Sequence, residues 1–118
     1  MVIIQLNNLI DFVAEVFSHS ESSPEEARRI ATYLTTANLT GHDSHGVIRV
    51  PLYVQWKKLG SVVPDQTVEI VVDTPSLAVI DGKFGYGQTV TPQAVQIGID
   101  KCKKAGLAAI ARAKEVAR

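Results

Sequence analysis

The sequence predicts an α/β (α+β) fold in which a helical region, residues 1–60, precedes a mixed α/β region, residues 61–118. Apolar residues recur every three or four positions through the first half, which is the spacing of amphipathic helices. After residue 66, short β-branched runs replace that spacing and indicate strands. The stretch GSVVPDQ, residues 60–66, separates the two patterns and predicts a loop. We therefore expect two regions that meet near residue 60.

The first two helices are predicted by apolar spacing and by capping residues. The spacing from Leu6 to Phe17 predicts an amphipathic helix, and residues 2–5, VIIQ, are compatible with a short strand before it. Ser23 is a typical N-cap, Pro24 suits a first helical position and Glu26 completes a capping-box pattern. We expect a second helix from Pro24 to about residue 39, ended by the glycine at position 41.

The elements after the second helix follow from the same rules. Helical spacing from Val47 to Leu59 predicts a third helix, with Pro51 tolerated in its first turn. Residues 67–74 and 77–82 predict two strands joined by a tight TPS turn. A Gly-rich turn leads to Thr91 and Pro92, which predict a helix start, and that helix should reach about residue 104 and end at the glycine at position 106. Residues 107–111 predict a third strand, and RAKEVAR, residues 112–118, is left unassigned.

Composition and charge exclude several classes of function. The chain has 118 residues, of which 46% are hydrophobic and 20% charged, as in soluble globular proteins. Twelve basic residues balance twelve acidic ones, so no net charge attracts nucleic acid or an anionic membrane. The apolar runs are far shorter than the roughly 20 residues that span a bilayer. We expect neither nucleic acid nor a membrane as a partner.

The N-terminus and the cysteine count predict a location. MVIIQLNNLIDFV has no basic start and no small-residue cleavage site, so we do not expect a signal peptide. Cys102 is the only cysteine of the sequence, which excludes an internal disulfide. A reducing cytoplasm is the simplest setting.

The stretch NLTGHDSHGVIRVP, residues 38–51, concentrates polar and ionisable groups. In one interpretation Asp43 or Ser44 caps a helix that begins near residue 46, and His45 lies on the surface of its first turn. In the other, His45 exchanges a proton with a substrate while Arg49, four residues later on the same helix face, holds a carboxylate. The pattern alone leaves both open.

Other chemistries find less support. His42 and His45 with Asp43 do not complete a tetrahedral zinc set, so we expect no metal. A hydrolase is disfavoured because neighbouring Ser44 and His45 rarely adopt triad geometry and G-x-S-x-G is absent. His19, between two serines, is assigned no chemical role.

The Gly-rich turn does not match a dinucleotide fingerprint. Its glycines at positions 82, 85 and 87 do not give G-x-G-x-x-G, so a Rossmann site is not supported. Glycines that permit a sharp strand-to-helix turn explain the stretch, although backbone N–H groups at the helix start remain available to an anionic ligand.

The segment LTGHDSHGVIRVPLYVQWKKLG, with the later LAVIDGKFGYGQTVTP, resembles the malate/L-lactate/L-sulfolactate dehydrogenase family. The resemblance covers residues 6–110 and the N-terminal third of that family, whose fold is unrelated to the Rossmann-type lactate and malate dehydrogenases. Its D-S-H-G-x-x-R segment is the specific part. It implies that residues 1–60 carry the D-S-H-G motif and that residues 61–118 begin a mixed-sheet, non-Rossmann NAD(P)-binding domain that is incomplete here.

The resemblance also implies an activity and site residues. Family members transfer hydride between NAD or NADP and C2 of a small 2-hydroxy or 2-oxo acid, some reduce cyclic imines or diketo sugar acids, and homodimers are expected. Carried over, His45 is the general acid or base, Ser44 hydrogen-bonds the substrate or orients the imidazole, and Arg49 is a carboxylate-binding candidate. Nothing is transferred to His42, and the cofactor-binding residues stay unknown.

Length is the main departure from the family. Family members continue after the LAAIA strand into a His-rich loop that meets the cofactor, whereas this chain ends on RAKEVAR. We expect a fragment that alone binds NAD weakly and turns over nothing measurable. The alternative is a non-catalytic remnant or interaction module, in which exposed strand edges and an apolar face serve assembly.

Overall fold

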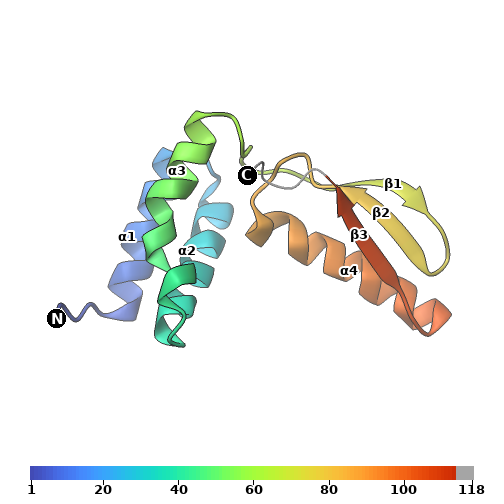
Figure 1. Ribbon diagram of the computed structural model, residues 1–118, viewed down its shortest axis with the longest axis horizontal. Helices are drawn as coiled ribbons and strands as arrows, with labels where there is room; N and C mark the ends of the chain where they lie inside the picture. Colours follow the sequence, from blue (N-terminus) through green and yellow to red (C-terminus); the bar gives the residue numbers. More distant parts are fainter. Residues whose placement is uncertain (114–118) are drawn as a thin grey trace. The chain divides into compact units, whose positions relative to one another are not determined.

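The computed structural model describes residues 1–113 and shows two compact units, Met1–Gly60 and Ser61–Arg118. The first unit is helical and the second contains a three-stranded sheet with one helix, as Figure 1 shows. Residues 114–118, most of the unassigned RAKEVAR stretch, lie outside the described residues. The predicted fold class is confirmed: four α-helices and a mixed sheet form within residues 1–113.

Helices α1 (Leu6–His19) and α2 (Pro24–Leu39) pack against each other and form the core of the first unit. Their buried apolar side chains recur at helical spacing, so each helix turns one stripe toward the other. Residues 2–5 are exposed and form no strand, which corrects the expectation from VIIQ, because no neighbouring strand pairs with them. The buried apolar side chains of the two helices are Ile10, Val13, Phe17, Ala27, Ile30, Ala31 and Leu34.

The start of α2 confirms the predicted cap. The Ser23 hydroxyl accepts the Glu26 backbone N–H at 3.2 Å, and Pro24 takes the first helical position. The Glu26 carboxylate is buried and accepts a hydrogen bond from the Ser22 hydroxyl at 2.7 Å. A buried carboxylate is tolerated at this end of a helix because it faces a hydroxyl donor and the positive end of the helix dipole.

Helix α3 (Val50–Lys58) begins later than the sequence predicts. Two 3₁₀ turns, η1 (Asp43–His45) and η2 (Val47–Arg49), precede it, and Pro51 lies in its first turn as expected. The Tyr53 ring meets the Phe17 ring of α1 edge-on, with 6.2 Å between ring centroids. An ion pair of 2.7 Å joins Lys57 to Glu21, so side chains of α3 contact the region of α1 at both points.

The sheet of the second unit has the order β1-β2-β3. Strands β1 (Glu69–Asp73) and β2 (Leu77–Asp81) form an antiparallel hairpin, and β3 (Ala109–Ala113) runs parallel to β2, with Leu77 opposite Ala109. Helix α4 (Gly87–Ala105) connects β2 to β3 and contacts both (Figure 1). A Cβ built on Gly98 would lie 3.1 Å from the Ile110 side chain, which shows how closely this helix approaches β3.

Helix α4 begins at Gly87, not near Pro92 as the sequence predicts. The buried Tyr86 is its N-cap, and the Tyr86 carbonyl accepts the N–H groups of Thr89 and Val90 at 2.9 and 3.0 Å. Pro92 therefore lies inside the helix, where a proline costs about 3 kcal/mol. Burial of Thr89, Val90 and the later Ala94 offsets this cost.

Within residues 1–113, no helix combines the length and the apolar character that crossing a bilayer requires.

Candidate active site around His45

The C-terminus of α2 sets the direction of the candidate site segment, residues 43–49. Gly41 adopts φ +87°, and its N–H donates to the Asn38 carbonyl at 3.1 Å. The next N–H, from His42, reaches back to the Ala37 carbonyl at 2.8 Å. This pair of bonds is a Schellman motif, which ends a helix and reverses the chain beside it. The sequence prediction of Gly41 as the stop is confirmed, and the site segment returns along α2.

The site segment is not a continuous helix. Gly46 separates the two 3₁₀ turns with φ −94° and ψ −149°, so the expectation that His45 and Arg49 share one helix face is wrong. The two residues are connected through Ser44 instead. The Arg49 Nε donates to the Ser44 carbonyl at 2.7 Å, which folds the arginine back over the first turn.

Ser44 and His45 contact each other through their side chains. The Ser44 Oγ lies 3.0 Å from the His45 Nδ1, although neighbouring residues were expected to rarely face each other in triad geometry. This contact engages the Nδ1 of His45, an exposed residue, and so orients the ring. Within residues 1–113 the His45 side chain has no other hydrogen-bond partner, so Nε2 is available to a ligand.

The cap of this segment comes from α2 and not from Asp43 or Ser44. The 3₁₀ turn Val47–Arg49 and helix α3 have no side-chain cap of their own. The Asn38 Oδ1 accepts the Val47 N–H at 2.8 Å, and the Asn38 Nδ2 donates to the Asp43 Oδ1 at 2.8 Å. Asn38 was not predicted as a site residue, since its partners lie beyond a chain reversal. An asparagine in the last helical turn, followed by a glycine stop and a polar segment, was the available signal.

A groove of about 600 Å³ opens beside His45 on the outer side of α2. It is large enough for a small organic acid. Ser44 and Arg49 are not among its lining residues, so the structure places only part of the predicted site along this groove. The lining residues are Thr32, Tyr33, Thr36, Ala37, Thr40, His42 and His45.

The remaining histidine and the acidic residues show no metal cluster. The His19 Nδ1 lies 2.8 Å from the Glu15 carbonyl, which gives this ring a helix-end contact at the C-terminus of α1. In the part of the chain that the structure describes, no three His, Cys, Asp or Glu side chains come together in a group that could hold a metal ion.

In the Gly-rich turn, the space beside Gly85 is filled by side chains from other parts of the second unit. A Cβ built on Gly85 would lie 2.7 Å from the Val90 Cγ1 and 2.9 Å from the Gln66 Cβ. The Gly85 N–H donates to the Gly82 carbonyl at 2.9 Å, and the Asp81 carboxylate accepts the Lys83 N–H at 2.8 Å. These contacts fit the interpretation of a tight strand-to-helix turn, and they identify no set of residues that would hold a nicotinamide nucleotide.

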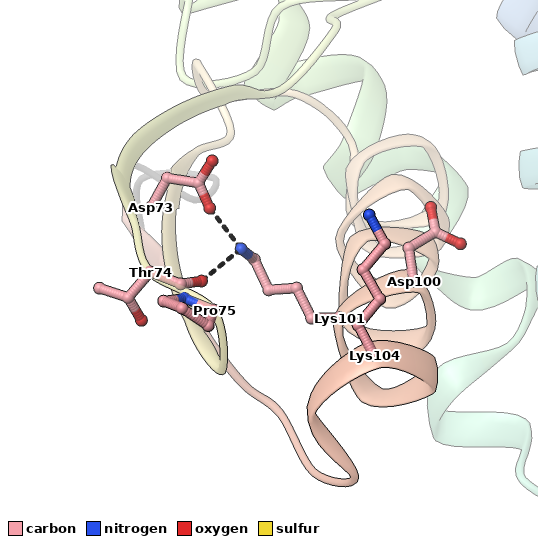
Figure 2. A pocket seen from close by; sticks show the side chains of 6 residues that line it. All are labelled: Asp73, Thr74, Pro75, Asp100, Lys101 and Lys104. Atoms are coloured by element: carbon pink, nitrogen blue, oxygen red, sulfur yellow. Dashed lines mark hydrogen bonds and ion pairs between the residues drawn. The ribbon is translucent and has the colours of Figure 1, made fainter.

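A second hollow, of about 390 Å³, lies between the β1–β2 turn and the last turns of α4 (Figure 2). Lys101 points across it, pairs with the Asp73 carboxylate and donates to the Thr74 carbonyl at 2.6 Å. Lys101 thus ties α4 to the hairpin. Asp73, Thr74, Pro75, Asp100, Lys101 and Lys104 line the hollow.

The fold and the site together define a class of protein. A helical unit bears a histidine and an arginine on a clamped turn, and a β-hairpin with a crossover helix and a parallel third strand follows it. The family model of the malate/L-lactate dehydrogenases matches residues 4–115, and the chain belongs to this family. The resemblance predicted from the D-S-H-G-x-x-R segment is confirmed.

Individual relatives support this membership. Hydroxycarboxylate dehydrogenase B of Escherichia coli O157:H7 is 35% identical over 103 residues, which are 87% of this chain and 28% of that protein. L-sulfolactate dehydrogenase of Methanocaldococcus jannaschii is 34% identical over 110 residues, 93% of this chain and 32% of that protein. The solved structure of malate dehydrogenase from Pyrococcus horikoshii OT3 superposes with a TM-score of 0.89 at 29% identity, over 97% of this chain and 33% of that one. The chain therefore spans about a third of the length of these relatives.

Proposed function

We propose that this chain supplies the proton-transfer part of a dehydrogenase site, in which hydride passes between NAD or NADP and C2 of a small 2-hydroxy or 2-oxo acid. The observation that carries the proposal is the Ser44–His45 contact of 3.0 Å, which leaves the His45 Nε2 open to a ligand. It stands in a chain of the malate/L-lactate dehydrogenase family, in which related proteins are named as dehydrogenases of malate and sulfolactate.

The chemistry requires one proton for each hydride. Reduction of a 2-oxo acid consumes the hydride and one proton and yields the 2-hydroxy acid, so the C2 oxygen needs a donor as its negative charge develops. The His45 imidazolium gives that proton from Nε2, and the neutral ring takes it back in the oxidation direction. The nicotinamide supplies or accepts the hydride when it is bound. Ser44 keeps the ring oriented through Nδ1.

Arg49 is the proposed carboxylate ligand. Its Nε is engaged by the Ser44 carbonyl, while its terminal guanidinium nitrogens have no partner within residues 1–113. Two terminal N–H groups match the two oxygens of a carboxylate. Because Arg49 and His45 are both connected to Ser44, a carboxylate on Arg49 would bring the neighbouring C2 oxygen toward the imidazole.

The wider assignments rest on the family. Residues 1–60 carry the acid–base site and residues 61–118 begin the NAD(P)-binding domain. The functional assembly is a cytoplasmic homodimer. The family membership supports a nicotinamide nucleotide without choosing between NAD and NADP. We expect the 118-residue chain alone to bind NAD weakly and to show no measurable turnover; nicotinamide-dependent turnover that His45→Ala abolishes would contradict this expectation.

Oxamate, an unreactive analogue of a 2-oxo acid, tests the site without turnover. We expect millimolar oxamate to shift the NMR signals of the Arg49 Nε–H and the His45 ring, while acetamide, which lacks the carboxylate, leaves them in place. Arg49→Gln should remove the response and Arg28→Gln, at an exposed arginine paired with Asp11, should keep it. Equal shifts with both compounds, or no shift with oxamate, would overturn the proposal.

A non-catalytic interaction module is the second candidate. All five residues of β1 are exposed, and they include Ile70, Val71 and Val72. Apolar side chains exposed along an edge strand favour association. A chain that sediments as an oligomer and ignores oxamate would favour this candidate.

A further inference from the structure

Asn38 uses both ends of its side-chain amide on the site segment. The Oδ1 accepts the Val47 N–H and the Nδ2 donates to the Asp43 carboxylate, each at 2.8 Å. These two partners lie on either side of Ser44 and His45 in the chain. An N–H needs an acceptor and a carboxylate needs a donor, and the amide satisfies both at once because its oxygen accepts and its nitrogen donates.

Gly46 makes room for this amide. A Cβ built on Gly46 would lie 2.1 Å from the Asn38 Oδ1 and 2.4 Å from its Cγ, distances that no Cβ contact tolerates. The glycine has φ −94°, outside the left-handed region, so the conformation of the backbone does not require it. Space for Asn38 therefore explains the glycine of the D-S-H-G motif.

The other hydrogen bonds of the segment are local. The N–H groups of His45, Gly46 and Arg49 each donate to a carbonyl three residues earlier, at 2.9, 3.1 and 3.0 Å. Such bonds shape a turn without fixing where it stands on the protein. Asn38 belongs to α2, whose inner face is held in the core by Ile30 and Leu34. The amide thus fixes the position of the turn relative to α2.

We propose that Asn38 is a positioning residue for His45: its amide clamps the turn that holds the imidazole and, through the Ser44 carbonyl, the arginine. This role rests on the proposed function. Asn38 and Gly46 depend on each other: the amide needs the space that the glycine leaves, and the glycine is needed only because the amide is there. A shift of about 1 Å at a reacting group can cost about a hundredfold in rate, so a clamp that holds His45 in place would affect the reaction rate.

The test follows NMR signals of the 118-residue chain and needs no turnover. In Asn38→Ala we expect the Val47 amide to exchange with solvent about tenfold faster, the factor equivalent to about 1.4 kcal/mol. We also expect the His45 ring nitrogen signals to move as the Ser44 contact loosens. The His19 ring, bonded to the Glu15 carbonyl in α1, is the internal control and should not move.

A swapped pair separates positioning from a general loss of stability. Asn38→Asp keeps the acceptor for Val47 but sets two carboxylates against each other, so it should move the His45 signals. Adding Asp43→Asn restores a donor opposite an acceptor and should return them. Unchanged His45 signals in Asn38→Ala, or no return in the swapped pair, would overturn the positioning role. If the unmodified chain shows no response to oxamate, the proposed function is overturned instead.

Discussion

The site segment, residues 43–49, and the Gly-rich turn, residues 82–87, are two glycine-containing connections that differ in what occupies the space beside the glycine. At Gly46 the occupant is the polar Asn38 amide, whose hydrogen bonds hold the backbone while the outer atoms of His45 and Arg49 stay open. At Gly85 the occupants are the Val90 methyl group and the Gln66 Cβ. The first connection presents chemical groups to a ligand, whereas the second closes a core.

Gly46→Ala should have the largest effect on stability. The new methyl group displaces the Asn38 amide and breaks its two hydrogen bonds, one of them to a carboxylate, at a cost of about 2–4 kcal/mol. Chemical denaturation measures this cost. In the background of Asn38→Ala the same change should cost less than about 1 kcal/mol, because the overlap is gone. An equal cost in both backgrounds would show that the Asn38 amide is not what restricts the space beside Gly46.

Gly85→Ala should destabilise the second unit by about 1–3 kcal/mol, since the Val90 side chain and the Gly82 carbonyl at 3.2 Å leave little space for a methyl group. Thermal unfolding measures the loss. The oxamate response of Arg49 should persist in this variant below its unfolding transition. A response that disappears in the folded variant would show that the Gly-rich turn contributes to the ligand site.

Lys101→Met should have the smallest effect. The lysine bonds the exposed Asp73 carboxylate and the Thr74 carbonyl. The Lys101 side chain is only 15% exposed, but Asp73 stays in contact with solvent, so we expect the pair to contribute about 0–1 kcal/mol. Unfolding at low and high salt measures it, and the small difference from the parent chain should shrink further at high salt. Gln96→Met, at an exposed residue of α4 that bonds Asp100, is a matched control. A loss above about 2 kcal/mol would contradict the expectation that the Lys101–Asp73 pair is a weak contact screened by solvent.

The helix starts show what local sequence can and cannot predict. Ser23 with Pro24 predicts the start of α2 correctly, because the Ser23 hydroxyl caps the helix and Pro24 takes its first position. Thr91 with Pro92 offers the same pattern, yet α4 starts earlier because the buried Tyr86 caps it. A capping rule uses only neighbours in the sequence, so it cannot predict which residue the tertiary fold buries.

For the candidate site, the sequence predicts the residues but not their arrangement. Ser44, His45 and Arg49 were selected by residue type, spacing and family resemblance, and the structure connects all three through hydrogen bonds. Their relation was predicted wrongly, since an extended glycine replaces the helix that spacing suggested. Asn38 was missed because its bond to Val47 spans nine residues and a chain reversal, a distance over which no periodicity operates.

The central claim is that His45 transfers the proton, and a chimera tests it most directly. Residues 6–110 of this chain would replace the matching third of the Methanocaldococcus jannaschii L-sulfolactate dehydrogenase, and sulfolactate oxidation would be followed with NAD and NADP supplied separately. We predict turnover by the chimera, and a loss of about 10²–10⁴-fold in kcat for His45→Gln. His19→Gln, at a histidine outside the candidate site, should leave kcat unchanged. An active chimera whose kcat survives His45→Gln would contradict the account.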